Sequence, residues 1–292
     1  MISELQEARI VSRGGPKNAR DRLLAAIPLH ERRMELAGIS TAVLEGGYGP
    51  PIVLLHGPGE FAAVWMRVIP SLVATHHVVV PDLPGHGESG AGEAPIDVAR
   101  ITQWLSDLIQ GTCASPPVVV GHCLGGAIAL RFAIQNPDRL RGLVLVDSYG
   151  LAPFRPTAKF AFALIRFMMR PNARTQERVF RGCFADYDGL RSEVGAPWDA
   201  LAEYALDRAV TPQNRTVMRN LMPKLAMPAI PHADLARISV PTTLLWGRHD
   251  LQVRLRIAET ASARYGWPLH VIENARDDPA FEEPDAFLRA LR

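Results

Sequence analysis

The chain has 292 residues, 48% of them hydrophobic and 21% charged, enough for one large α/β domain with an insertion or for two small domains. Its formal net charge is +2 and its arginines are scattered among acids, so the composition gives little support to nucleic-acid binding. No apolar run approaches the roughly 18 residues that span a bilayer, so we expect no membrane partner.

Residues 1–32 form a lead segment, in which the sequence predicts one helix near residues 18–26. Residues 1–20 are polar and charged, and they lack the apolar stretch of an export signal. The three cysteines, Cys113, Cys123 and Cys183, have no zinc-ligand spacing and cannot all pair within one chain. We therefore expect reduced thiols, a cytoplasmic setting and no metal. The lead segment could pack on the core or form a contact in a homo-oligomer, and the sequence leaves both open.

An alternating pattern begins at residue 33. Residues 34–39 and 41–45 meet at a glycine-containing turn, which predicts an antiparallel hairpin at a sheet edge. Short apolar runs then alternate with segments of helical period, which indicates a mostly parallel, buried sheet with helices on both faces. The predicted strands are 52–55, 77–80, 118–120, 143–146, 242–246 and 269–272. The predicted helices are 62–74, 96–110, 124–135, 254–264 and 279–291.

The alternation stops within residues 149–231, which are rich in helix formers and aromatic residues and are interrupted by prolines. We interpret this stretch as an inserted helical cap over the strand ends. The α/β core is then formed by residues 33–148 and 232–292.

A candidate nucleophile turn occupies residues 121–126, Gly-His-Cys-Leu-Gly-Gly, between a predicted strand and a predicted helix. That context gives meaning to a G-x-nucleophile-x-G pattern. A reversal this tight strains the central residue, and glycines beside it remove the Cβ atoms that would clash. Cys123 would then lie at a helix N-terminus, where backbone N–H groups favour a thiolate or an oxyanion.

Two further motifs precede this turn. His56-Gly57-Pro58-Gly59 follows the strand at 52–55, and residues 81–89 read Pro-Asp-Leu-Pro-Gly-His-Gly-Glu-Ser. With these three motifs in order, the chain resembles the α/β-hydrolase family from about residue 34 onward, in particular its capped esterases, C–C hydrolases and haloperoxidase-like members. The resemblance implies the α/β-hydrolase fold, with a mostly parallel sheet of about eight strands.

The resemblance also assigns roles to residues. The oxyanion hole would be formed by the N–H of Leu124 and by the loop at Pro58 and Gly59; because Pro58 has no N–H, Gly59 is the better donor. His56 and His122 would belong to the pocket, with His56 bracing the loop. The acid would be Asp250, and Asp147 at the end of an earlier strand is the alternative.

The base histidine of the family should follow the last strand, two residues before a proline. Asp277 occupies that position here. A carboxylate beside a thiol raises the pKa of the thiol, whereas an imidazolium lowers it. If Asp250 and Asp277 both reach the site, their repulsion would leave a proton on one of them. His249 and His122 adjoin the acid and the nucleophile but should point away, and His86 lies on a loop near the pocket mouth.

The resulting prediction is a hydrolase that attacks an ester, thioester or lactone carbonyl through Cys123, with Asp250 and Asp277 in the charge-relay positions. It would need no cofactor and would act on a small apolar substrate. Two alternatives stay open: a catalytically silent protein that binds a ligand in the same pocket, and a cofactor-free lyase, haloperoxidase-like enzyme or acyltransferase. The turn also resembles the G-x-C-x-G-G box of polyester synthases, which are longer. The sequence does not separate natural divergence from deliberate substitution at Cys123 and Asp277.

Overall fold

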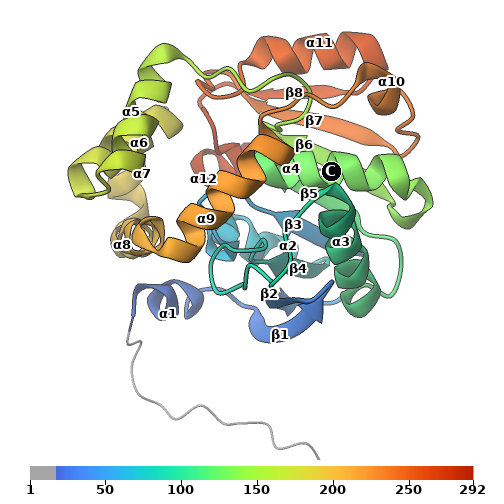
Figure 1. Ribbon diagram of the computed structural model, residues 1–292, viewed down its shortest axis with the longest axis horizontal. Helices are drawn as coiled ribbons and strands as arrows, with labels where there is room; N and C mark the ends of the chain where they lie inside the picture. The colour runs from blue at the N-terminus through green and yellow to red at the C-terminus, as the bar shows by residue number, and fades with distance from the viewer. Residues whose placement is uncertain (1–17, 292) are drawn as a thin grey trace, which may run out of the picture.

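The computed structural model describes residues 18–291, apart from the side chains of Gln213, Thr216 and Val217. Its centre is an eight-stranded sheet with the strand order β1-β2-β4-β3-β5-β6-β7-β8, in which β2 alone runs antiparallel to its neighbours (Figure 1). The strands are β1 (His30–Leu36), β2 (Ile39–Gly46), β3 (Pro51–Leu55), β4 (His77–Pro81), β5 (Val118–His122), β6 (Gly142–Val146), β7 (Thr242–Gly247) and β8 (Leu269–Ile272). All six predicted parallel strands are confirmed, and so is the fold class.

The predicted edge hairpin is confirmed, but its position was wrong. The turn falls at Ala37 and Gly38, both with positive φ, and β1 begins at His30. The lead segment therefore ends before residue 30 rather than at residue 32. The first four residues of β1 are polar, and Arg32 pairs with Glu45 on β2, so this part of the edge strand carries no apolar run to detect. The predictions for residues 1–17 lie outside the described residues.

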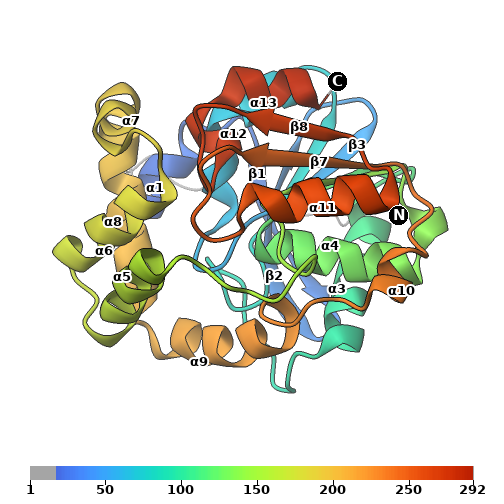
Figure 2. The same cartoon turned by 90° about the horizontal axis from the view of Figure 1, so that it is seen from above.

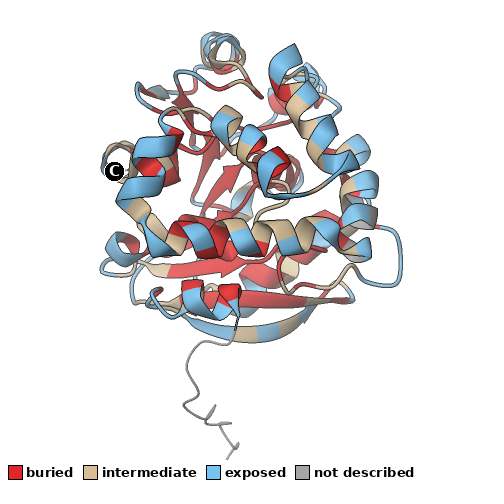
Figure 3. Ribbon diagram, turned by 90° about the vertical axis from the view of Figure 1, so that its left-hand side faces the viewer, coloured by how far each residue is buried: buried red, intermediate tan, exposed pale blue. Residues whose placement is uncertain are grey.

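Helices cover both faces of the sheet and bury two apolar cores (Figure 3). One face carries α3 (Val98–Thr112), α4 (Leu124–Gln135), α10 (His232–Leu235) and α11 (Leu255–Tyr265). The other carries α1 (Ala19–Leu24), η1 (Ala62–Arg67), α2 (Ile69–Leu72), α12 (Pro279–Glu282) and α13 (Pro284–Ala290). A short 3₁₀ turn, η2 (Pro137–Arg139), joins α4 to β6.

Two of the predicted helices are each divided in the structure. Residues 62–74 form η1 and α2, with Pro70 in the first turn of α2, and residues 279–291 form α12 and α13, with Pro284 opening α13. Proline lacks an N–H and is tolerated only in the first turn of a helix, so each proline starts a new element.

Within the described part of the chain, five α-helices and a π-helical turn are inserted between β6 and α10, the short helix that precedes β7. They are α5 (Ala158–Met169), α6 (Ala173–Cys183), α7 (Tyr187–Val194), α8 (Ala196–Val210), α9 (Pro212–Leu221) and η3 (Met222–Ala226). Figures 1 and 2 show α5 to α8 grouped beside one end of the sheet. Trp198 joins this insertion to the core, since its ring lies 5.2 Å from that of Phe184 and 6.2 Å from that of Phe281 on α12. Among residues 18–291, no helix has the length and apolar character to cross a membrane.

The close approach of α4 to β3 gives a first prediction. A Cβ atom at Gly125 would lie 2.3 Å from the carbonyl oxygen of Leu55, a backbone atom that cannot move aside. We expect Gly125→Ala to lower the free energy of unfolding by about 3 kcal/mol, measured by urea denaturation.

Gly111→Ala on α3 is the matched control, because its Cβ would meet only the flexible end of Met34 at 2.6 Å. It should be neutral or stabilising by up to about 1 kcal/mol, as expected for alanine in a helix. An equal change in the free energy of unfolding for Gly125→Ala and Gly111→Ala would contradict the close contact between α4 and β3.

Candidate active site

Cys123 lies at the junction of β5 and α4 in a strained backbone conformation, with φ 45° and ψ −106°. Its N–H donates to the Val146 carbonyl at 3.0 Å, and its own carbonyl accepts from the Tyr149 N–H at 3.1 Å. The turn also requires glycine, because a Cβ on Gly121 would lie 2.6 Å from the Cα of Gly126. These contacts over-determine the turn and hold Cys123 at the carboxyl edge of the sheet.

Asp277 reaches the sulfur. The Cys123 thiol lies 3.4 Å from Asp277 Oδ1 and 3.2 Å from the Asp147 carbonyl oxygen. Both Cys123 and Asp277 are buried, and the cysteine has no exposed surface. Asp277, which the sequence resemblance suggested for the position of the family's histidine, is therefore in direct contact with the candidate nucleophile.

His122 also belongs to this cluster, contrary to the expectation that it would point away. Its Nε2 lies 2.7 Å from the backbone oxygen of Asp277 and 3.9 Å from Asp277 Oδ1. Its Nδ1 lies 3.3 Å from Glu60 Oε2. The expectation failed because the strained backbone of Cys123 breaks the strand alternation at that point, so consecutive side chains no longer have to lie on opposite sides. Sequence analysis did not single out Glu60.

Burial and neighbouring charges shift the pKa values of His122 and Cys123. Burial alone would lower the pKa of His122, but the neighbouring charges of Cys123 and Glu60 and the hydrogen bond with Asp277 raise it well above its ordinary value. Burial raises the pKa of the Cys123 thiol well above its ordinary value, and Asp277 raises it further, while His122 opposes both. The two groups therefore influence each other: His122 favours the thiolate form of Cys123, and a charge on the sulfur favours the imidazolium form of His122.

Three aspartates meet behind the sulfur. Asp250 accepts hydrogen bonds from the N–H groups of Gln252 at 2.6 Å and Val253 at 3.0 Å. Burial, followed by the charge of Asp277, raises the pKa of Asp250 to about 8. Burial and the charges of Asp250 and Asp277 raise the pKa of Asp147 well above its ordinary value, and Asp147 hydrogen-bonds to Asp250. Asp250 and the alternative acid Asp147 therefore share one site, where burial and mutual repulsion favour the protonated form of both.

A polar chain that sequence analysis missed orients Asp277. The Tyr149 hydroxyl donates to Gln252 Oε1 at 2.9 Å, and the Gln252 amide donates to Asp277 Oδ2. The backbone N–H of Asp277 donates to the Cys183 carbonyl at 3.0 Å. Gln252 follows Asp250 by two positions in the same loop, but a glutamine in a loop gives no chemical signal by itself.

The loop after β3 carries the other candidates for the oxyanion hole, Pro58 and Gly59. The Gly57 N–H donates to Glu60 Oε2 at 2.6 Å, and Pro58 has no N–H to offer. Gly59 has φ 79° and open space around it. Leu124 is the first residue of α4, so its N–H is one of those that a helix leaves without an internal partner. His56 braces the loop: its Nε2 accepts from the Leu83 N–H at 2.9 Å, and its Nδ1 lies 2.8 Å from the Gly57 oxygen.

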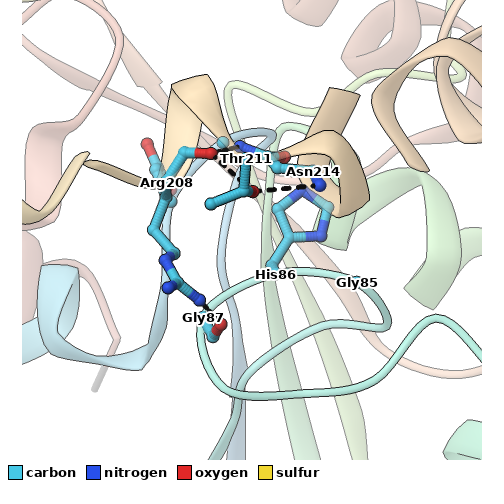
Figure 4. A pocket seen from close by; sticks show the side chains of 8 residues that line it. Gly85, His86, Gly87, Arg208, Thr211 and Asn214 are labelled. Carbon is cyan, nitrogen blue, oxygen red and sulfur yellow. Dashed lines mark hydrogen bonds between the residues drawn. The ribbon is translucent and has the colours of Figure 1, made fainter. Parts of the chain in front are cut away.

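A small cavity of about 10 Å³ lies between Gly59, His86 and Asn214, under the start of α9 (Figure 4). That volume suits one water molecule. His86 Nε2 and Asn214 Oδ1 are buried without a hydrogen-bond partner among the described residues, so both could bond to such a water. His56 and His122, which we assigned to the pocket, do not line this cavity, because their rings turn toward the loop backbone and toward Glu60 and Asp277.

The fold brings together metal-ligand types that no sequence spacing indicated. One ligand atom from each of His122, Cys123 and Asp277 lies within 4.8 Å of the others. A metal-bound histidine must be neutral with one nitrogen free. Here both nitrogens of His122 already face oxygen atoms, and its pKa is raised by the charges around it. In this arrangement the three residues fit a hydrogen-bonded cluster better than a metal centre.

A strained nucleophile turn at the carboxyl edge of a sheet with this strand order defines the α/β class of hydrolases. The family model described as the alpha/beta hydrolase family matches residues 52–290. The chain therefore belongs to the alpha/beta hydrolase family.

Its relatives are esterases and hydrolases, in agreement with the predicted enzyme class. A pimeloyl-[acyl-carrier protein] methyl ester esterase of Vibrio atlanticus is 30% identical over 261 residues, 84% of this chain and 94% of that protein. An uncharacterised protein of Mycobacterium tuberculosis is 27% identical over 262 residues, 86% of this chain and 76% of that protein. The structure of a 2-hydroxy-6-oxo-6-phenylhexa-2,4-dienoate hydrolase from Rhodococcus superposes with a TM-score of 0.78 at 24% identity, covering 91% of this chain and 98% of that one.

The raised pKa of Asp250 predicts how stability depends on pH. With a folded-state pKa of about 8, Asp250 keeps a proton that the unfolded chain releases near pH 4. The free energy of unfolding contributed by this group therefore falls as pH rises between about 4 and 8. Asp250→Asn removes that titration. Relative to wild type, we expect the variant to gain on the order of 2 kcal/mol between about pH 5 and pH 8, measured by urea unfolding at both values.

Asp138→Asn, at an exposed position after α4, is the control and should follow the wild-type pH profile. Parallel profiles for Asp250→Asn and wild type would contradict the assignment of a buried, protonated Asp250.

Proposed function

We propose that this protein cleaves esters, thioesters or lactones through a covalent acyl intermediate on Cys123. The observation that carries the proposal is the contact of 3.4 Å between the Cys123 sulfur and Asp277 Oδ1 at the strained turn. A carboxylate at this distance can accept the thiol proton, and a sulfur at a helix N-terminus has backbone donors beside it for the oxyanion.

In the first half of the reaction, the Cys123 thiol gives its proton to Asp277 as the sulfur attacks the carbonyl carbon. The carbonyl oxygen takes up the negative charge and accepts hydrogen bonds from the N–H of Leu124 and of Gly59. The tetrahedral intermediate then expels the alcohol or thiol, which leaves with the proton held by Asp277. An acyl thioester on Cys123 results. In the second half, water attacks this thioester, Asp277 takes the proton from water, and the proton returns to the sulfur as the acid departs.

His122 supports this proton transfer as a fixed positive charge. Its imidazolium lies between Glu60 Oε2, at 3.3 Å, and Asp277 Oδ1, at 3.9 Å. A cation in that position stabilises the charge that forms on sulfur when the proton leaves, which compensates in part for the missing histidine. Glu60 keeps the imidazolium charged and oriented. Asp250 and Asp147 act behind Asp277 as protonated, neutral partners.

The helical insertion acts as a cap in this proposal. The sulfur has no exposed surface, so substrate enters only when the insertion and the loops beneath it move apart. The Vibrio relative is named for the methyl ester of an acyl group on a carrier protein. The shared chemistry is attack on an ester carbonyl, and it supports an acyl ester or thioester as the substrate class of this chain.

Cys123→Ala tests the nucleophile. With an activated 4-nitrophenyl ester, the wild type should release a burst of nitrophenol equal to the enzyme concentration and carry the acyl mass on Cys123. The alanine variant should show neither, a loss of about 10⁴-fold or more in turnover. Cys113→Ala is the control, because Cys113 follows the last residue of α3 and its sulfur contacts the Thr112 hydroxyl at 3.4 Å. Tight ligand binding with no acyl adduct on wild-type Cys123 would favour the silent binding protein instead.

Asp277→His tests the base. A histidine at this position would act as general base and lower the thiol pKa, so we expect at least a 100-fold gain in esterase turnover. Asp277→Asn keeps the size of the side chain but cannot take a proton, and it should lose turnover. If both variants behave like wild type in stopped-flow assays, Asp277 does not take part in proton transfer.

A further inference from the structure

A second pocket opens beside the active site. It is a groove of about 490 Å³. Its walls are the loop after β7, the start of α11 and the loop before α12, together with Thr157, the N-cap residue of α5. We call it the Arg254 groove. Its charged lining consists of Arg248, His249, Asp250, Arg254, Arg256 and Arg276. Asp250 belongs to both sites, and Arg276 directly precedes Asp277, so the groove adjoins the proposed acyl site.

The arginines of this groove are largely uncompensated. Arg248 pairs with Glu273 at 2.8 Å between Nε and Oε2. The Arg276 guanidinium donates to the neutral carbonyls of Arg181 and Phe184, at 2.6 and 2.9 Å, and its backbone N–H donates to Glu282 Oε1 at 2.7 Å. Within residues 18–291, no ion pair is formed by Arg254 or Arg256. Asp250 holds a proton at neutral pH and offers no counter-charge.

The position of two of these arginines is unfavourable for the fold itself. Arg254 is the N-cap residue of the 11-residue helix α11, and Arg256 follows within its first turn, which has no acidic residue. The N-terminus of a helix carries partial positive charge, so cations there lower stability. A bound anion would relieve this repulsion and the repulsion among the arginines together, and guanidinium groups bind carboxylate and phosphate through paired hydrogen bonds.

We propose that the Arg254 groove binds a carboxylate or phosphate group of the substrate while its acyl carbon reaches Cys123. The proposal rests on the proposed function and narrows its substrate class to anionic acyl esters or thioesters. It also replaces the apolar substrate that the sequence predicted. The sequence favoured an apolar substrate because the aromatic residues of the insertion are visible in the sequence. The arginines come together only in the fold, where the loops after β7 and β8 meet.

The kinetic test compares two 4-nitrophenyl esters, neutral butanoate and the singly charged hydrogen glutarate, with an acyl-coenzyme A as the phosphate-bearing thioester. In the variant with both Arg254→Gln and Arg256→Gln, the ratio of kcat/KM for an anionic substrate over the neutral ester should fall by about 10- to 100-fold, mainly through KM. A fall with glutarate alone identifies a carboxylate site, and a fall with the coenzyme A thioester alone identifies a phosphate site. Arg264→Gln, exposed in the last turn of the same helix, should leave the ratio at the wild-type value.

A binding test separates this proposal from the proposed function. Calorimetric titration of the Cys123→Ala protein with glutarate and with coenzyme A needs no turnover, and the double arginine variant in that background should lose the heat of binding. The double variant should also unfold at the same or a higher temperature, because it removes positive charge from the start of α11. An unchanged substrate ratio together with unchanged anion binding would overturn the assignment, as would an equal loss in Arg264→Gln. Binding without any hydrolysis would retain the groove and reject the proposed function.

Discussion

The geometry of one turn determines what this protein can do. Between β5 and α4 the chain reverses within a single residue, Cys123, whose φ of 45° is costly for any side chain other than glycine. The turn is held because Gly121 and Gly126 let backbones touch and because Val146 and Tyr149 bond to both peptide groups of the cysteine. That bend positions the sulfur at the N-terminus of α4, and it turns His122 toward the same side. The backbone conformation of this turn therefore determines where the side chains of Cys123 and His122 lie.

The second constraint is the protonation of a group of buried titratable side chains. Cys123, His122 and the carboxylates Asp147, Asp250 and Asp277 are all buried. Three ionised carboxylates could not share such a volume, because burial and mutual repulsion disfavour each charge. Burial and mutual repulsion raise the pKa of Asp147 and of Asp250, which favours a proton on each of them, and a positive charge on His122 offsets a negative charge on Asp277. The thiol of Cys123 has the carboxylate of Asp277 within reach at 3.4 Å.

The sequence predicted the parts of this architecture that local chemistry encodes. Six parallel strands and the helix after Cys123 follow from apolar runs and glycines, and the meeting of Asp250 with Asp277 follows from their places after the last two strands. The sequence did not predict Glu60 on His122, or the chain from Tyr149 through Gln252 to Asp277. These contacts join residues that lie 62, 103 and 25 positions apart in the chain, and their residue types are common in loops. The start of the edge strand at His30 was also missed, since its first residues are polar on both faces.

The two unusual positions of this site are chemically connected. A hydroxyl nucleophile needs a strong base, because alcohols are far weaker acids than thiols, and a carboxylate is a poor acceptor for their protons. In the proposed mechanism, Asp277 at 3.4 Å accepts the thiol proton; the ordinary pKa of a thiol, near 8.5, is far below that of a serine hydroxyl, although burial and Asp277 raise it here. The same mechanism makes the second half-reaction the slow one, because water is a still weaker acid that Asp277 must deprotonate. An acyl group would then remain on Cys123 longer than in a site with histidine. Thiols and amines that reach the thioester compete better with water under those conditions, so this pairing of cysteine with aspartate favours acyl transfer as well as hydrolysis.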